Sequence, residues 1–584
     1  MQKNLNKRSI YGKIFGLKKR KSGKADAHEK RRLKGGSRVK KRITAAFAAL
    51  TAVLLCLAAC GSETAVVLRF AVETQAVTFD PQIAESGTAK MTVRNTFEGL
   101  VRPDSDGKIS PGVAEKWDIS PDGLTYTFYL REGAVWHVTK NAAKQLAGKL
   151  PEDFAPESET GGYVMPKVTA NDFVFAFRRA LDPATAAPDA ELLTSIVNAR
   201  ESLAGTVQPS EIGVSAPDEK TLVIRLAERN DAFLSVLAEP VCMPCNETFF
   251  NACGGRYGLL IAYSLSNGPF YLSYFDETTY RLRKSADYTG AHAAKADTLW
   301  FYYNSDSDTV LQKLKNGEYS GAYVTDSQLK KLKVGKNDEV KRVADTNRVF
   351  LINNKNEKLA IKELRDAFLF ATDTAAVAAD AGEISAVFPV PDVACVENAS
   401  APAPVFDETK VSAALDKALE AAETDSMSLT VLCDKKDSET LRRQLQRWQR
   451  IFGIRLEIKL EETDAQTLES RVAGSSWEIA FYPLRVSSDE AGALFGRFVT
   501  DSSSPLTGTA NEDIDKKTAE YTASTGDERS RLFTEICSAL ISDGAVLPVW
   551  KETSCFVCTD GVHGVYVGAG ADRRYFENAY INRD

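Results

Sequence analysis

The chain has 584 residues, 44% hydrophobic and 26% charged, so it is neither a disordered chain, a collagen repeat nor a small disulfide scaffold, and its length indicates several domains. The formal net charge of -6 averages two unlike pieces: residues 1–59 hold 17 Lys and Arg against two acids, and residues 60–584 hold 56 against 77, a net charge of -21. We expect no nucleic-acid partner for the acidic body, because phosphate binding needs clustered positive charge.

A targeting segment separates the two pieces. Lys40-Lys41-Arg42 precedes an apolar run, Ile43 to Ala59, which ends in Leu57-Ala58-Ala59-Cys60-Gly61. A basic region, a short apolar run and small residues before a cleavage site are typical of a secretory signal. The run of about 17 residues lies at the lower edge of what can span a bilayer.

The end of this segment resembles a bacterial lipobox, which implies that Cys60 is acylated and becomes the new amino terminus. Two acyl chains with a third on the amine would hold the protein stably at a membrane. We therefore expect residues 1–59 to be a signal peptide with a long basic n-region and residues 60–65 to be the lipidated cysteine and its tether, anchored to the outer face of the cell membrane. The alternatives are an ordinary signal with a chance cysteine and a short membrane anchor.

The mature body begins with a mixed α and β pattern. Val66 to Val72 reads as a strand, and Leu124 to Leu130 alternates after the turn signal Pro121-Asp-Gly123. Thr169 and Asp172 have the spacing of a capping box before a helix that reaches Leu181 and stops at Asp182-Pro183.

The clearest local unit lies near the carboxyl end of the chain. Its five elements alternate strand and helix, and the first helix places Leu441, Leu445, Trp448, Ile451 and Phe452 on one face. The elements are strand 428–432, helix 438–452, strand 454–460, helix 464–473 and strand 477–482. Such a succession predicts parallel strands with crossover helices and hence an α/β domain, whose ligands bind at the carboxyl edge of the sheet, just after Tyr482.

Cysteine and histidine give little support to a metal or catalytic centre. Cys242 with Cys245 and Cys555 with Cys558 formally match zinc half-sites, but they lie about 310 residues apart, so disulfides or buried thiols explain them better. The three His of the body are scattered, and no phosphate-binding loop or nucleophile elbow is present. We expect no metal, no cofactor and no enzymatic activity. A pair of catalytic carboxylates far apart in the sequence would, however, not be recognised from the sequence pattern.

A family resemblance adds to this reading, because a series of segments recurs in a characteristic order and spacing. They are Thr78-Phe-Asp-Pro81, Asn95-Thr-Phe-Glu-Gly-Leu-Val101, Pro111-Gly-Val-Ala-Glu-Lys-Trp117, Thr125-Tyr-Thr-Phe-Tyr-Leu-Arg-Glu-Gly-Ala-Val-Trp136, Thr169 to Pro183, Asn267-Gly-Pro-Phe-Tyr-Leu272, Leu364 to Asp373 and Ala545-Val-Leu-Pro-Val-Trp550. Together they resemble the oligopeptide- and dipeptide-binding proteins of ABC importers, the family 5 extracellular solute-binding proteins. The resemblance spans about residues 66–584.

The resemblance implies a two-lobed α/β fold of the periplasmic-binding-protein type (type II), with an extra subdomain in the first lobe and a hinge that closes over a solute. Lobe I would comprise residues 66–110, 200–302 and 545–584, its extra subdomain 111–199, and lobe II 303–544. The hinge would lie at Tyr302, Tyr303 and Ala545.

The function implied is that of a monomeric carrier without a cofactor. It would capture a peptide or related small solute and present it to an ABC permease and its ATPase, while the lipid anchor keeps it at the membrane. The alternative is a surface lipoprotein with the same fold that acts as a peptide-sensing receptor or adhesin.

The presumed ligand site departs from the family pattern. Peptide binders carry a Gly-Trp-x-Ala-Asp-Tyr type loop after the third strand of the second lobe, and its Asp pairs with the amino terminus of the peptide. When this segment is aligned without gaps to the family loop, Leu484 occupies the position of that Trp and Ser487 the position of that Asp, and Arg485 lies between them. Ser487 cannot supply the carboxylate that a buried ammonium needs.

Three readings of this loop stay open. Asp489 supplies the carboxylate if the loop is shifted by two residues, Arg485 favours a carboxylate or another anionic group, or Arg485 points to solvent at the cleft rim. The hypothesis is that the standard amino-terminal clamp is weakened or replaced. The full set of candidate ligand-binding residues is Glu73, Thr74, Tyr482, Leu484, Arg485, Ser487 and Asp489.

Overall fold

The computed structural model describes residues 65–584, apart from 105–106, 152–153, 155–165, 231, 392–394, 397–405, 487–490, 501, 503–504, 525, 569, 571 and 583–584. The signal segment and Cys60 therefore lie outside the described residues, as do Ser487 and Asp489. No helix within the described part of the chain is both long and apolar enough to cross a membrane.

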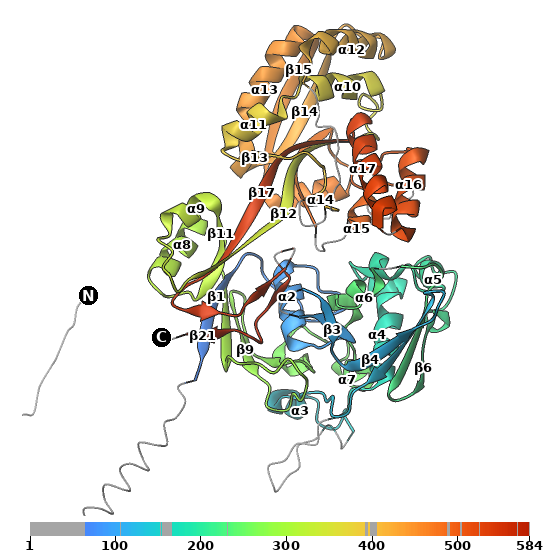
Figure 1. Cartoon of the computed structure of the whole chain (residues 1–584), viewed down its shortest axis with the longest axis vertical. Helices are drawn as coiled ribbons and strands as arrows, with labels where there is room; N and C mark the ends of the chain where they lie inside the picture. Colours follow the sequence, from blue (N-terminus) through green and yellow to red (C-terminus); the bar gives the residue numbers. More distant parts are fainter. Residues whose placement is uncertain are drawn as a thin grey trace, which may run out of the picture. The chain divides into compact units, whose positions relative to one another are not determined.

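One large sheet connects most of the described chain (Figure 1). Its strands follow the order β15-β14-β16-β12-β17-β11-β1-β10-β9-β8, with β13 beside β17. In that order they are β15 Leu456–Thr463, β14 Met427–Asp434, β16 Ile479–Arg485, β12 Glu339–Ile352, β17 Val546–Cys558, β11 Gly321–Thr325, β1 Val67–Val72, β10 Thr298–Tyr303, β9 Thr279–Lys284 and β8 Phe270–Phe275, and β13 is Ile384–Ser385.

Two long strands, β12 and β17, run through both halves of this sheet. The first residues of β12 pair with the end of β17 where β17 also pairs with β11, whereas the last residues of β12 pair with β16. The β12–β17 register shifts between Val343 and Thr346, where two residues of β12 lie opposite one of β17, so β12 has one extra residue at the passage from one half to the other. We call the β1 side lobe I and the β14–β16 side lobe II.

Lobe II encloses its part of the sheet between two layers of helices. Along β12, Phe350 and Ile352 belong to one buried cluster and Val349 and Leu351 to the other, because successive strand residues point to opposite faces. The first cluster includes α10 Lys362–Ala371, α11 Thr374–Ala381, α12 Glu408–Ala421 and α13 Ser438–Phe452. The second includes α14 Ala465–Ala473, α15 Gly492–Phe495, α16 Glu512–Ala523 and α17 Gly526–Ser542.

The βαβαβ unit predicted near the carboxyl end is confirmed. β14, α13, β15, α14 and β16 follow one another, and β14 pairs in parallel with both β15 and β16. Four of the five residues predicted on the inner face of α13, Leu441, Leu445, Trp448 and Phe452, are buried, and Ile451 is half-buried.

Lobe I adds a second, smaller sheet and several short helices. The predicted strands β1 and β5 are both present. The smaller sheet contains, in order, β4 Ala114–Ile119, β5 Thr125–Leu130, β7 Thr221–Arg225 and β6 Val214–Asp218. Other strands form two-stranded sheets, which are β2 Val101–Pro103 with β3 Ile109–Pro111, β18 Val562–His563 with β21 Tyr580–Ile581, and β19 Tyr566–Val567 with β20 Arg574–Tyr575. The helices outside lobe II are α2 Gly87–Thr96, α3 Lys140–Gln145, α4 Ala170–Ala180, α5 Ala199–Leu203, α6 Phe233–Val236, α7 Glu247–Cys253, α8 Ser307–Lys315 and α9 Asp326–Lys331.

The domain boundaries implied by the resemblance stay predictions. In the structure α8 and β11, which the resemblance assigns to lobe II, contribute to a buried cluster with Ala71 of β1 and Cys555 of β17.

The eight cysteines in the described part of the body form no disulfide bonds. Seven of them are buried, and Cys395 is half-buried. Burial raises the pKa of Cys245 to about 12, so this thiol stays protonated at neutral pH. No group of three or more His, Cys, Asp or Glu within the described ranges is placed to hold a metal ion.

The capping box predicted for α4 is present, and its acid is buried. Asp172 Oδ2 accepts hydrogen bonds from Thr169 N at 2.8 Å and from Trp136 Nε1 at 3.3 Å, and its Oδ1 accepts from Asn246 Nδ2 at 3.1 Å. Burial nevertheless raises the pKa of Asp172 to about 6, because these hydrogen bonds only partly offset the loss of hydration.

This pKa predicts how stability depends on pH. The folded chain holds the Asp172 proton up to about pH 6, whereas the unfolded chain releases it near its ordinary pKa of 3.8. Stability is therefore lost as pH rises through this window, by about 3 kcal/mol for a shift of about two units. Denaturant unfolding of wild type and Asp172→Asn at pH 4 to 7 should show wild type losing that amount relative to the variant. A difference independent of pH would contradict the assignment.

Candidate functional site at the junction of the lobes

On the lobe I side, Glu73 follows directly after β1 and forms an ion pair with Arg574 of β20. Arg574 Nη2 lies 3.0 Å from Glu73 Oε2, and Nη1 lies 3.5 Å from Oε1. The Arg574 side chain is 0% exposed, whereas the Glu73 side chain is 40% exposed. The guanidinium lies over the rings of Tyr323 and Phe556, at 4.9 and 5.5 Å from their centroids. Arg574 thus holds Glu73 from the protein interior and leaves one side of the carboxylate facing solvent.

Thr74 fixes the backbone next to Glu73. Its hydroxyl accepts a hydrogen bond from Thr88 N at 3.2 Å and donates one to Thr88 Oγ1 at 3.0 Å. Since Thr88 lies in the first turn of α2, this contact ties the end of β1 to the start of that helix. The Thr74 hydroxyl is therefore engaged inside the protein.

The segment around Arg574 is itself held by buried ion pairs. Arg94 Nη2 of α2 lies 2.5 Å from Glu239 and 3.0 Å from Asp572, and Arg573 also pairs with Glu239. Each of these acids and Arg94 is at least 90% buried. An unpaired charge at this depth would be strongly destabilising, so the segment is held in one position.

On the lobe II side, Arg348 of β12 joins the two long strands to α13. Its Nε lies 2.7 Å from Glu552 of β17, and its Nη1 lies 3.0 Å from Asp437, which precedes α13. The Arg348 side chain is 2% exposed. This triad lies in lobe II immediately beyond the register shift between β12 and β17.

The residues predicted at the end of β16 differ in environment. Leu484 is fully buried, and Tyr482 is half-buried with a pKa raised by burial. Arg485, the last residue of β16, pairs in register with Thr346 and has a side chain that is 53% exposed. Its Nη1 lies 3.3 Å from Glu469 Oε1, whose side chain is equally exposed. Leu484 therefore belongs to the core, whereas Arg485 is accessible.

Asp345 lies between the two lobes, within the register shift of β12. Its Oδ2 accepts a hydrogen bond from Gly570 N at 3.0 Å, and its Oδ1 accepts one from Thr346 Oγ1 at 3.0 Å. Burial raises the pKa of Asp345, and the positive charge of Arg485 acts in the opposite direction. Gly570 precedes Arg574 by four residues, so Asp345 connects the Arg574 segment to lobe II.

Tyr323 of β11 lies beside the guanidinium of Arg574. Burial raises the pKa of its hydroxyl, Arg574 opposes this rise, and Glu73 and Asp345 add to it. The hydroxyl is buried without a hydrogen-bond partner in the described part of the chain. Glu73, Arg574, Tyr323, Asp345 and Arg485 thus form a connected set, which we call the junction cluster. It offers charges of both signs to a polar ligand.

The predicted hinge residues lie at the ends of strands. Tyr302 and Tyr303 pair with Ala71 and Val72 at the end of β10, and Ala545 is buried directly before β17.

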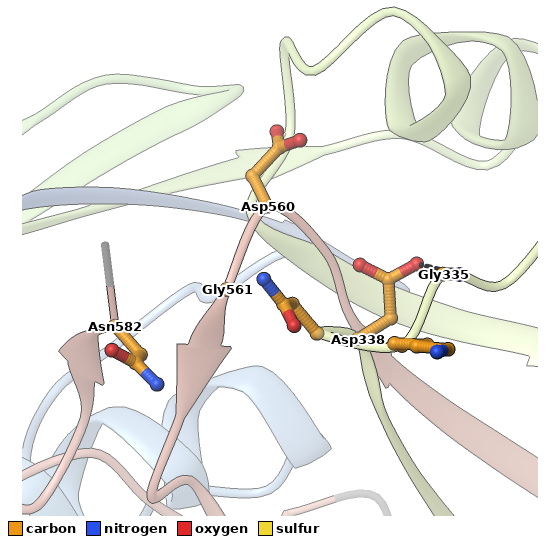
Figure 2. A pocket seen from close by; sticks show the side chains of 7 residues that line it. Gly335, Asp338, Asp560, Gly561 and Asn582 are labelled. Carbon is orange, nitrogen blue, oxygen red and sulfur yellow. Dashed lines mark hydrogen bonds between the residues drawn. The ribbon is translucent and has the colours of Figure 1, made fainter. Parts of the chain in front are cut away.

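A separate open pocket lies away from these predicted residues. The pocket lies between the loop before β12 and the turn after β17 (Figure 2). Its volume is about 370 Å³. One of its two carboxylates, Asp338 Oδ2, accepts a hydrogen bond from Gly335 N at 2.6 Å, so it stabilises its own loop. The pocket is lined by Gly335, Lys336, Asn337, Asp338, Asp560, Gly561 and Asn582.

Sequence reasoning missed Arg574, Tyr323 and Asp345. Asp345 left no distinguishing signal, because β12 also contains Glu339, Lys341, Arg342 and Arg348. Arg574 left none, since its partner Glu73 is 501 positions away.

Comparison with known proteins agrees with the two-lobed fold described above. The family model for bacterial extracellular solute-binding proteins, family 5 Middle, matches residues 108–509. The dipeptide-binding protein DppE of Bacillus subtilis (strain 168) is 26% identical over 521 residues, which cover 84% of this chain and 88% of that protein.

Two solved structures have the same fold. Peptide-bound OppA of Listeria monocytogenes matches with a TM-score of 0.74 and 20% identity, covering 89% of this chain and all of that one. OppA of Haemophilus influenzae in complex with RPPGFSPFR matches with a TM-score of 0.74 and 22% identity, covering 89% of this chain and 99% of that one.

The Arg348 triad gives a stability prediction. Arg348→Met leaves Glu552 and Asp437 without their shared cation, so we expect a loss of about 3 kcal/mol in the free energy of unfolding. Adding Glu552→Gln and Asp437→Asn should recover part of the loss, because no charge is then left unpaired. Arg531→Met, which breaks an exposed pair with Glu528 on α17, is the matched control and should barely change denaturant unfolding. Equal losses in both single variants would refute the prediction.

Proposed function

Because the chain belongs to the bacterial extracellular solute-binding proteins of family 5, we propose that it captures a peptide or a related small solute between its lobes and delivers it to a membrane permease driven by an ATPase. The observation that supports this most directly is the match to DppE, a dipeptide-binding protein, along most of both chains. The junction cluster supports it further, because charged groups of both signs gather where β12 and β17 pass between the lobes.

Capture requires the lobes to move relative to one another, and two strands limit that motion. We propose that closure bends β12 and β17 at the register shift between Val343 and Thr346, where the ladder is already irregular. Tyr302 and Tyr303 stay predicted hinge residues on lobe I, and Ala545, also predicted there, lies deeper in lobe II, where its carbonyl accepts a hydrogen bond from Ile352 N at 3.0 Å. The solute would then contact Glu73 on lobe I and the end of β16 on lobe II, the two regions that the resemblance implies.

The carrier would act at the outside of the membrane. Export through the signal segment and acylation at Cys60 would leave the protein anchored to the membrane by its first residue. As a monomer, it would meet its permease by diffusion in the plane of the membrane. A carrier of this kind releases its solute unchanged, so no turnover is expected.

Native mass spectrometry of the purified protein provides the first test. Incubation with a random tripeptide library should give complexes whose added mass equals an intact tripeptide, because closure buries the solute and slows its release. Peptides recovered after denaturation should be unmodified. Cleaved peptides would indicate a hydrolase, and a protein that binds peptides but supports no uptake in cells carrying the permease would act as a receptor instead.

Lipidation can be tested separately in a bacterial host. We expect the wild-type protein to enter the detergent phase of a Triton X-114 extraction and Cys60→Ala to remain in the aqueous phase or uncleaved. Cys56→Ala is the matched control, because Cys56 lies within the signal segment and its loss should change nothing. Detergent partitioning of mature Cys60→Ala would contradict acylation at this residue.

A further inference from the structure

The accessible charges of the junction cluster differ in sign between the lobes. Lobe I presents the carboxylate of Glu73, and lobe II presents the guanidinium of Arg485. Asp345 and Arg574 also belong to the cluster, but both are at least 95% buried, so they cannot meet a solute directly. Within the junction cluster, the groups left to contact a charged solute are therefore one anion on lobe I and one cation on lobe II.

Glu73 is prepared to bind an ammonium group. A carboxylate offers about four acceptor positions, and Arg574 occupies one on each oxygen from the interior. The remaining positions lie on the exposed side of Glu73. Because Arg574 and the Thr74–Thr88 contact already fix this region, binding orders few further groups, which favours affinity.

Arg485 is free to exchange its partner. Its ion pair with Glu469 joins two half-exposed side chains at 3.3 Å, and such pairs contribute little to stability. A planar guanidinium has five donors and binds a carboxylate through two parallel hydrogen bonds. A solute carboxylate excluded from water by closure would therefore compete well with Glu469.

The two groups belong to one neighbourhood. Arg485 pairs in register with Thr346, the residue after Asp345, and the next residue, Val486, donates its N–H to the Asp345 carbonyl at 3.1 Å. Asp345 is also hydrogen-bonded to Gly570, four residues before the Arg574 that holds Glu73. A single small solute at the junction can thus meet both lobes.

We propose that the solute is a zwitterion bound with its ammonium group on Glu73 of lobe I and its carboxylate on Arg485 of lobe II. This orientation is opposite to the clamp that the family resemblance implies, in which an acid of the lobe II loop holds the ammonium group, and it fits the serine found at the aligned position 487. Each lobe contributes one charge, so the solute favours the closed form through contacts that exist only when the lobes approach. The proposal deepens the proposed function and depends on it.

Calorimetry on the full mature protein can test this orientation. The probe is the tripeptide most enriched from the random library, in free, N-acetylated and C-amidated forms. We expect Glu73→Gln to weaken binding of the free peptide about tenfold or more and to leave binding of the N-acetylated peptide unchanged. Arg485→Gln should weaken the free peptide similarly and leave the C-amidated peptide unchanged.

Matched controls separate the possible failures. Glu469→Gln removes the surface partner of Arg485 and should not weaken binding, and an unchanged affinity for the N-acetylated peptide shows that Glu73→Gln still folds. If Asp489→Asn abolishes discrimination between free and N-acetylated peptide while Glu73→Gln does not, the orientation is wrong although the proposed function stands. If no form of any tripeptide binds to wild type, the proposed function fails and this orientation fails with it.

Discussion

The lobes depend on one shared antiparallel pair of strands, β12 and β17. Backbone hydrogen bonds of this pair continue from the sheet of lobe I into that of lobe II, so each lobe's core is built partly on the same two strands. A continuous ladder resists twisting, and this one is irregular between Val343 and Thr346 and again between Arg348 and Val349, which is where it can yield. Glu73 and Arg485, the groups proposed to bind the solute, lie on either side of the irregularity between Val343 and Thr346. The proposed motion and the proposed recognition would thus occur in one region of the fold, although its residues come from distant parts of the sequence.

Buried ion pairs fix the rest of this region. Arg94 and Arg574 in lobe I and Arg348 in lobe II each have a carboxylate within about 3 Å, and each is almost completely buried. Removing one partner of a buried ion pair destabilises the protein far more than an exposed ion pair stabilises it. These buried contacts therefore fix the positions of the segments more than they raise the free energy of unfolding. The exposed Arg485 differs, because its partner can be replaced without leaving a buried charge.

The features that sequence reasoning recovered are local. The capping box of α4 and the alternation of strands and helices from 427 to 485 depend on residues a few positions apart, and the apolar face of α13 follows from helical periodicity. The partners of Glu73 and Asp345 could not be found this way, since they lie more than 200 positions away and pairing over that distance leaves no periodic signal. Leu484 stays an untested ligand candidate, and its burial could not be foreseen for a related reason. The gap-free alignment carried over the family's loop residue, whereas β16 turns Leu484 into the core.

The ion pairs of the C-terminal segment also set the order in which the chain can fold. Arg94, Arg102 and Glu73 are made some 480 to 500 residues before their partners Asp572, Glu577 and Arg574. Lobe I therefore cannot complete these ion pairs until residues 572–577 have been made, while lobe II, contributed mostly by a contiguous segment, has its residues together earlier. If the protein is exported as we propose, this delay would keep lobe I unfolded, and so able to pass through a translocation channel, during most of its synthesis.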